Sequence, residues 1–327
     1  MNDKLKLLEI ENLSVEYIVN NVVVEAVRDL SLDIGEGECL GLVGETGAGK
    51  TTTALAVMGL IPDPPGKIAG GQIKFEGEDL LRKSPRQMRK IRGSAISMIF
   101  QDPMTSLNPV ISVGDQIMEV ILLHNKISRG EATVRTQKML ETVGIPANRY
   151  SEYPHQFSGG MKQRVMIACA LACNPKLLIA DEPTTALDVT IQAQILELIE
   201  NLKKEFNTAM LMITHDLGIV SEICDRVAVM YAGNVVELGF VQAVYDRPSH
   251  PYTAGLFKSL PDLDEDVDRL EPIPGMMPDP ANLPAGCPFA PRCLIHSRRC
   301  EEERPALVEM ETGHNIACFN FRRMTAC

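Results

Sequence analysis

The chain has 327 residues, of which 45% are hydrophobic and 23% charged, and this composition excludes the disordered, collagen-like and coiled-coil classes. Its 32 basic and 43 acidic residues give a formal net charge of −11, and it contains no Trp and few other aromatic residues. Such a chain is a poor candidate for a nucleic-acid-binding protein, because it repels polyphosphate and offers few rings on which bases can stack.

The sequence shows neither a membrane span nor a signal peptide. The longest apolar run, from Val165 to Cys173, is far shorter than the roughly 20 residues that cross a bilayer. The N-terminal segment MNDKLKLLEIEN has no long apolar core and no small-residue cleavage site. We therefore expect a cytosolic protein, and its length predicts about two domains.

Runs typical of β-strands precede a glycine-rich turn and a helix. The runs are Leu5–Ile10, Val22–Val27 and Glu38–Val43. The segment TTTALAVMGLI, residues 51–61, then has the pattern of a helix. A turn between a strand and a helix is the context in which a phosphate-binding loop operates.

The turn itself fits the P-loop pattern. It consists of Gly44, Glu45, Thr46, Gly47, Ala48, Gly49, Lys50 and Thr51, and Thr52 follows. The glycines let backbone N–H groups curl around phosphates, Lys50 reaches the β- and γ-phosphate oxygens, and the Thr51 hydroxyl can ligate Mg²⁺. The alternative is a chance glycine-rich turn, which the flanking strand and helix argue against. We therefore predict that these residues bind ATP and Mg²⁺.

The middle of the chain is helical in pattern and leads to two short buried strands. Residues from about 102 to 165 resemble an inserted helical subdomain with Pro and Gly breaks. An apolar helix from Met161 to Cys173 precedes the strand Leu177–Ala180, and the segment AMLMIT is a second apolar strand that ends at His215. Apolar strands that alternate with helices predict an α/β sheet with helices on both faces.

Two acidic residues follow the first of these strands. Asp181 ends the strand, where it could face Thr51 across neighbouring strands and hold Mg²⁺. Glu182 comes next and is placed to deprotonate an attacking water, the general-base role in phosphoanhydride hydrolysis. Without the P-loop, the alternative of two solvated acids at a strand end would carry more weight.

The character of the chain changes at about residue 240. Five acids lie within Asp262 to Asp268, and seven prolines fall between Pro272 and Pro291, which excludes long helices there. We expect a nucleotide-binding domain over residues 1–240 and an irregular C-terminal extension over residues 241–327.

The extension carries a cysteine cluster. Cys287, Cys293, Cys300 and Cys318 have the spacing C-x5-C-x6-C-x17-C. Four clustered cytosolic thiols indicate a metal site, and all-thiolate ligation allows zinc or a 4Fe-4S cluster. His296 and His314 allow a zinc site with both Cys and His ligands. The alternative to any metal site is four unrelated reduced thiols.

Further segments resemble the ABC ATPases. FSGGMKQR, residues 157–164, resembles the ABC signature motif, in which Met161 stands where the family usually has Gln. The resemblance also covers Gln101 in FQDP, the segment from Ala186 to Asp188, His215 and the adenine-stacking Tyr17. It implies an ABC-type P-loop ATPase core with an N-terminal antiparallel β-subdomain, Gln101 as a further Mg²⁺ contact and His215 as a contact of the γ-phosphate.

The same resemblance implies a second nucleotide-binding subunit. In ABC ATPases the signature of one domain covers the ATP on the P-loop of the other, and this chain has one copy of each. The residues that would act in trans are Ser158, Gly159, Gly160, Met161 and Asp188. The partner is either a second copy of this chain or a homologous subunit.

More narrowly, the chain resembles the ATPase subunits of bacterial dipeptide/oligopeptide and related nickel importers. The segments that carry this resemblance are FQDPMTSLNPV, YPHQFSGGMKQRVMIA, HPYTAGLFKSLP and the cysteine-containing tail. It implies two transmembrane permease subunits, an extracytoplasmic substrate-binding protein and a peripheral position at the cytoplasmic face of the membrane. Some members with this tail carry a 4Fe-4S cluster, so the resemblance favours the cluster over zinc.

The sequence therefore predicts an ATPase subunit that couples closure of an ATP-bound dimer to peptide uptake. An importer of nickel or another small solute remains an alternative. A soluble ABC ATPase acting on nucleic acid is a rival from another class, but the chain has no paired ATPase halves, coiled coil or strongly basic surface pattern. A regulatory subunit with a degenerate site is disfavoured, because every hydrolytic position is filled.

Overall fold

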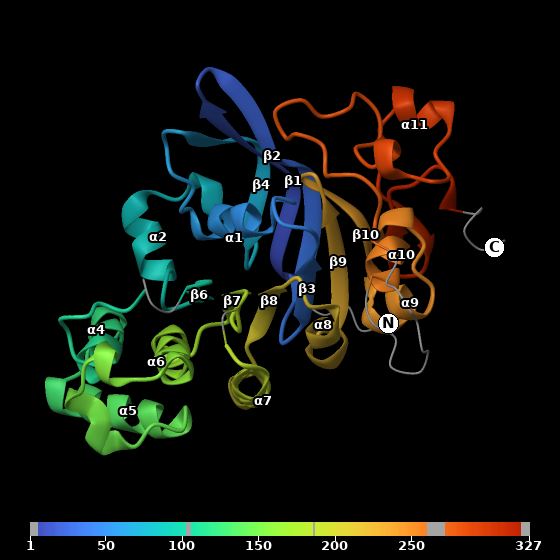
Figure 1. The fold of residues 1–327 in the computed structure, drawn as a ribbon. Coiled ribbons are helices and arrows are strands. Elements are labelled where there is room, and N and C mark those ends of the chain that lie inside the picture. Colours follow the sequence, from blue (N-terminus) through green and yellow to red (C-terminus); the bar gives the residue numbers. More distant parts are fainter. Residues whose placement is uncertain (1–5, 103–105, 186, 260–271, 322–327) are drawn as a thin grey trace. The chain divides into compact units, whose positions relative to one another are not determined.

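The computed structural model describes residues 6–102, 106–185, 187–259 and 272–321 (Figure 1). The chain divides into two compact units, each made of segments that are not continuous in sequence. Unit 1 comprises Met1–Leu8, Asp33–Cys39 and Lys74–Ile213, and unit 2 comprises Glu9–Leu32, Leu40–Ile73 and Thr214–Cys327. Ala186 and parts of the FQDPMTSLNPV and HPYTAGLFKSLP segments lie outside the described residues.

A four-stranded sheet forms the N-terminal part of the fold. Its strands, in the order β2-β1-β4-β5, are β2 (Val22–Gly35), β1 (Lys6–Val19), β4 (Gly66–Phe75) and β5 (Glu78–Asp79). Leu8 and Ile10 are buried on one side of Asn12, and Leu13 and Val15 on the other. Asn12 has a φ of 49° and shifts the alternation by one residue, so that a single apolar face is kept along a long strand.

In unit 2 the strand order is β11-β12-β10-β9-β3. The strands are β3 (Cys39–Val43), β9 (Arg226–Tyr231), β10 (Asn234–Phe240), β11 (Val308–Glu311) and β12 (His314–Ile316). β3 pairs with β9 in parallel, and the other neighbours are antiparallel. The helical segments are α1 (Lys50–Met58), α8 (Leu217–Ile223), α9 (Val241–Asp246), α10 (Pro251–Lys258), η4 (Ala290–Arg292) and α11 (Arg298–Glu302).

An aromatic cluster anchors the C-terminal extension to this sheet. The ring centroids of Tyr231 in β9 and Tyr252 in α10 are 4.6 Å apart, and Phe289 packs against both rings. Cys287 and Cys300 belong to the same buried core. Burial of large rings is a main source of apolar stabilisation, so this cluster fixes the extension onto β9.

Unit 1 contains three parallel strands in the order β8-β7-β6, with the bounds Ala209–Ile213, Leu177–Asp181 and Ile96–Ile99. All residues of these strands are buried, as expected for parallel strands covered on both faces. The helical segments are η1 (Leu80–Arg82), α2 (Pro85–Ile91), α4 (Val113–His124), α5 (Arg129–Thr142), η2 (Ala147–Ser151), η3 (Pro154–Gln156), α6 (Gly159–Leu171) and α7 (Val189–Phe206).

Helices α4, α5 and α6 contact one another and form the helical part expected from the sequence (Figure 1). The predicted alternation of strands and helices is confirmed, although β1 and β2 run well beyond the predicted Leu5–Ile10 and Val22–Val27. Within the described residues, none of the helices combines the length and apolar character needed to span a membrane.

Candidate nucleotide and cysteine sites

The P-loop of unit 2 contains three glycines with backbone conformations that other residues rarely adopt. Gly44, Gly47 and Gly49 have φ angles of 150°, 84° and 102°. A Cβ atom on Gly44 would lie 2.2 Å from the carbonyl oxygen of Met230, and one on Gly49 would lie 2.3 Å from that of Ala26. Glycine is needed at Gly44 and Gly49 because the backbone is left-handed there and the neighbouring strands leave no room for a side chain.

Lys50 and Thr51 lie where this loop enters α1. The Lys50 side chain is buried, and its Nζ donates to the carbonyl oxygens of Gly44 at 2.7 Å and Glu45 at 3.1 Å. Gly49 is the N-cap of α1 and supplies no side-chain cap, while Thr51 is exposed in the first turn. The N–H groups of a helix start, together with a buried ammonium, make a site for a polyphosphate.

The other predicted nucleotide contacts of unit 2 are Tyr17 and His215. The ring of Tyr17, half-buried in β1, lies against Gly66 in β4. His215 is exposed and follows Thr214, whose N–H donates to the carbonyl oxygen of Leu42 at 3.4 Å. That bond ties the residue before His215 to the strand that enters the P-loop.

In unit 1, Asp181 is the last residue of β7 and Glu182 follows it, as predicted. Asp181 is 2% exposed, and Glu182 has a φ of 45°, a left-handed conformation that is uncommon for a side-chain-bearing residue. Oε2 of Glu182 accepts hydrogen bonds from Nε2 of Gln101 at 3.0 Å and from Oγ1 of Thr185 at 2.9 Å. The structure thus brings Gln101 and Glu182 together, and it adds Thr185, which the sequence motifs did not indicate.

The signature residues lie at the start of α6. Ser158 is its N-cap and accepts from the N–H of Met161 at 3.4 Å, and Gly159 and Gly160 open the helix as expected. The Met161 sulfur accepts a hydrogen bond from Nη1 of Arg149 at 3.2 Å, so the Met161 side chain contacts another residue of unit 1. Asp188 is the N-cap of α7 and accepts from the N–H of Ile191 at 3.0 Å.

The cysteines of the extension come together as their spacing predicted. Cys287, Cys293, Cys300 and Cys318 line one small cavity. Burial raises the pKa of the Cys287 and Cys318 thiols to about 11, and the neighbouring thiols contribute to both shifts. Thiols with pKa values this high are protonated at neutral pH, so a cation bound by Cys287 and Cys318 would have to displace their protons.

The same region corrects the mixed zinc site. Among the described residues, no group of three or more His, Cys, Asp and Glu side chains is arranged to hold a metal ion. The prediction that His314 could be a ligand is wrong, because its buried Nε2 lies 2.8 Å from Oε1 of Glu237 in β10. His296 lines the cavity, with its Nδ1 2.9 Å from the carbonyl oxygen of Cys293.

Two residues of the extension contact the P-loop, and the sequence pattern did not reveal either of them. Arg292 forms a two-pronged ion pair with Glu45, and the Tyr252 hydroxyl accepts from the Glu45 N–H at 2.9 Å. These residues are separated from Glu45 by more than 200 positions, so no local motif could have signalled them.

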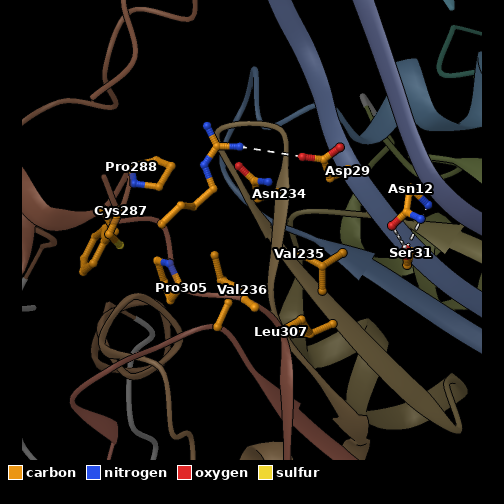
Figure 2. Close-up of a pocket in the computed structure, with 14 residues that line it drawn as sticks. Asn12, Asp29, Ser31, Asn234, Val235, Val236, Cys287, Pro288, Pro305 and Leu307 are labelled. Carbon is orange, nitrogen blue, oxygen red and sulfur yellow. Dashed lines mark hydrogen bonds and ion pairs between the residues drawn. The ribbon is translucent and has the colours of Figure 1, made fainter. Parts of the chain in front are cut away.

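A further pocket of unit 2 lies between the N-terminal sheet, β10 and the extension (Figure 2). Asn12 and Ser31 lie on one side of it and Cys287 and Pro288 on the other. Of the predicted site residues it contains Cys287 alone among those that the structure describes. It is therefore separate from the nucleotide residues.

Comparison with known families matches both parts of the chain. Residues 27–185 match the family described as ABC transporter. Residues 236–300 match the C-terminal region of the oligopeptide/dipeptide transporters.

Among individual relatives, the oligopeptide transport ATP-binding protein AppD of Bacillus subtilis is 50% identical over 96% of this chain and 96% of its own length. The oligopeptide transport ATP-binding protein OppD of Haemophilus influenzae is 51% identical over 96% of this chain and 97% of its own.

Solved structures agree with this fold. A dimeric ATP-binding cassette in a post-hydrolysis state with bound ADP and Pi is 25% identical, with a TM-score of 0.65, over 72% of this chain and 98% of that one. CbiO1 of Clostridium perfringens, part of an ABC transporter complex, is 30% identical with a TM-score of 0.64, over 74% of this chain and 92% of its own. The predicted ABC ATPase fold is thus confirmed, and this chain belongs to the ATP-binding proteins of the oligopeptide/dipeptide branch of the ABC transporter family.

Proposed function

We propose that this chain is the ATP-hydrolysing subunit of an importer for dipeptides or oligopeptides. The observation that carries the proposal is the presence, in one chain, of a P-loop ATPase domain and of the C-terminal region found in the oligopeptide/dipeptide transporters. The ATP-binding domain spans residues 1–240 and the extension spans residues 241–327. The names of the relatives at about 50% identity, which are oligopeptide transport proteins, support peptide as the transported solute.

Different residues bind the phosphates, the adenine and the Mg²⁺ ion of the nucleotide. Lys50 and the α1 N-terminus bind the phosphates of ATP, with Gly44 to Thr52 as the cradle, Tyr17 beneath the adenine and His215 at the γ-phosphate. Thr51, Gln101 and Asp181 supply the oxygen ligands that suit Mg²⁺, which when bound neutralises phosphate charge. Within unit 1, the Asp181 side chain is buried, as suits a carboxylate that binds a cation.

Glu182 is the general base. Its carboxylate is held in a fixed orientation by hydrogen bonds from Gln101 and Thr185. The left-handed backbone at Glu182 aims the side chain away from the path that a regular strand would give it. This orientation lets the carboxylate accept the proton of a water that attacks the γ-phosphate.

The complete site requires two nucleotide-binding subunits. Ser158, Gly159, Gly160 and Met161 at the start of α6, and Asp188 at the start of α7, complete the ATP site of the partner subunit. The dimeric cassette that resembles this chain supports such an arrangement. ATP binding closes the dimer and hydrolysis reopens it, which provides two states that a membrane subunit can sense.

Two membrane permeases are the partners that turn this cycle into transport. In unit 1, a groove of α4 is lined by apolar residues such as Met118 and Leu122, with the polar residues Asp115 and Arg129 beside them. Leu123 on this helix is 73% exposed, and Val110 just before it is 78% exposed. Exposed large apolar residues around a groove are typical of a protein-binding surface. The chain thus acts at the cytoplasmic face of the membrane, together with an extracytoplasmic substrate-binding protein.

The four cysteines of the extension hold a 4Fe-4S cluster, with zinc as the alternative. Their convergence on one cavity supports a thiolate-bound group. Iron, sulfide and zinc analysis of the anaerobically purified protein tests this assignment. Zinc without iron would identify a structural zinc site, and absence of all three would leave four reduced thiols.

Reconstitution tests the transport function. The chain is combined with its permease pair in proteoliposomes, and ATP-driven uptake of a labelled dipeptide is compared with uptake of Ni²⁺. We expect dipeptide uptake that disappears when Glu182→Gln replaces the wild-type chain. Uptake of Ni²⁺ alone would move the assignment to the nickel importers, and salt-sensitive binding to nucleic acid without any uptake would favour the soluble rival.

A further inference from the structure

The extension reaches the P-loop through one buried side chain. Arg292 ends the short turn η4, directly before Cys293, and its side chain is 6% exposed. Its Nη1 donates to Oε2 of Glu45 at 2.9 Å and its Nη2 to Oε1 at 3.1 Å. Two parallel charge-assisted hydrogen bonds fix both the position and the orientation of a carboxylate.

Arg292 is itself held on several sides. Its Nε donates to the carbonyl oxygen of Pro274 at 2.9 Å, and its Nη1 lies 3.3 Å from the Tyr231 hydroxyl. Burial lowers the pKa of Arg292, but its hydrogen bonds with Glu45 and Tyr231 outweigh this effect, so the net pKa is raised. A guanidinium with so many fixed partners has lost its rotamer freedom before ATP arrives.

Glu45 lies at the centre of the phosphate-binding turn. Its carbonyl oxygen accepts from Nζ of Lys50 at 3.1 Å and from the N–H of Ala48 at 3.1 Å. Its own N–H donates to the Tyr252 hydroxyl. A displacement of Glu45 would therefore move the lysine and the backbone N–H groups that the phosphates need.

The pair also matters electrostatically. Glu45 places a carboxylate in a loop that binds a polyanion, and an unpaired carboxylate there would repel ATP. The Arg292 guanidinium neutralises this charge at hydrogen-bond distance. The extension thus both shapes the P-loop and removes a charge that opposes ATP binding.

We infer that Arg292 is a positioning residue for ATP binding. We also infer that a well-ordered four-cysteine cavity holds Arg292 in place and thereby holds the P-loop in its binding conformation. The loop that carries Arg292 lies between Cys287 and Cys293, both of which line the cavity. The inference rests on the proposed ATPase function. It adds that the extension, which contributes none of the P-loop residues, sets the affinity for ATP.

The test is the KM for ATP and the kcat of the full-length chain, with thermal unfolding as a folding control. We expect Arg292→Ala to raise KM at least about tenfold while kcat at saturating ATP stays within about twofold. Arg292→Lys keeps the charge but loses the two-pronged geometry, so its KM should lie between those of the wild type and Arg292→Ala. The matched control is Arg298→Ala, because Arg298 pairs with Glu302 on the surface of the same extension.

Two further comparisons separate positioning from simple loss of structure. In a Glu45→Gln background, Arg292→Ala should add less than about twofold to KM, because both substitutions break one interaction. Cys293→Ser should raise KM in the wild type but have little effect in the Arg292→Ala background.

A KM unchanged in Arg292→Ala, or a fall in kcat alone, would overturn the positioning role. An effect of Cys293→Ser that is absent, or equal in both backgrounds, would overturn the link to the cavity. A wild-type chain that binds no ATP would instead contradict the proposed function, and this inference with it.

Discussion

The P-loop and the cysteine cavity of unit 2 are both built from irregular backbone, but they are specified in opposite ways. The P-loop is local: consecutive residues supply the glycines, the lysine and the helix start, and nearby backbone atoms leave no room for a Cβ at Gly44 or Gly49. The cavity gathers residues spread from Cys287 to Cys318 and depends on packing against Tyr231 and Tyr252. The backbone path of the P-loop is therefore set locally and distant residues only adjust it, whereas the cavity forms at all only when its distant anchors are in place.

The largest effect is expected for a substitution in the P-loop itself. Lys50→Ala deletes the ammonium that bridges the Gly44 and Glu45 carbonyl oxygens and reaches the phosphates. We expect ATP binding to be lost and phosphate release to fall by about 10³-fold. Equilibrium ATP binding and a phosphate-release assay check this, and an unchanged thermal midpoint would show that the fold is intact.

The next effect removes an anchor of the assembled region. Glu237 is fully buried, and its carboxylate accepts from the Ser249 and His250 N–H groups and pairs with His314. Glu237→Leu leaves these groups unpaired, so we expect a loss of about 4 kcal/mol of unfolding free energy. Denaturant unfolding measures it, with Glu311→Leu as a control, since Glu311 pairs with Arg247 on the surface. Equal losses in both variants would contradict the anchor role.

The stability of the region around His250 should depend on pH, because this histidine is buried. Burial lowers the pKa of His250 to about 4, from an ordinary value near 6.5. Between these values the unfolded chain binds the proton more readily, so stability should fall as the pH drops from about 6.5 to 4, by up to about 3 kcal/mol. His250→Asn, which keeps an acceptor for the Tyr252 N–H, should flatten this part of the profile. An unchanged profile in that variant would assign the acid sensitivity elsewhere.

The smallest effect connects the two regions. Tyr252→Phe leaves the Glu45 N–H without its partner, a cost of about 1 kcal/mol that corresponds to about a fivefold rise in KM for ATP. Tyr245→Phe is the matched control, because the Tyr245 hydroxyl bonds to the Leu217 carbonyl oxygen instead of the P-loop. The same KM in both variants would indicate that the extension does not act on Glu45.

Local features of the fold and site could be predicted from the sequence. The start of α1 at Lys50, the N-cap at Ser158 and the acids that end β7 follow from patterns a few residues long. Each is decided by neighbouring residues: glycine conformations, a capping hydroxyl and an apolar strand.

Features that depend on distant contacts could not be predicted in this way. The length of β1 depends on the left-handed backbone at Asn12 and on pairing within its sheet, so the apolar run alone underestimated it. His314 was a candidate metal ligand because the sequence around it does not show that its side chain pairs with Glu237, which is 77 positions away. Arg292 was hidden for the same reason, since its partner Glu45 is 247 positions distant.

The proposed function assigns Glu182 as the general base for the hydrolysis of ATP. The most direct measurement compares ATP binding and Mg²⁺-dependent phosphate release in wild-type protein and Glu182→Gln, side by side. We expect Glu182→Gln to bind ATP within about threefold of the wild type, to lose at least about 10²-fold in turnover, and to remain as an ATP-bound dimer. Turnover close to that of the wild type would contradict the assignment of Glu182, because the proton would then be accepted by another group.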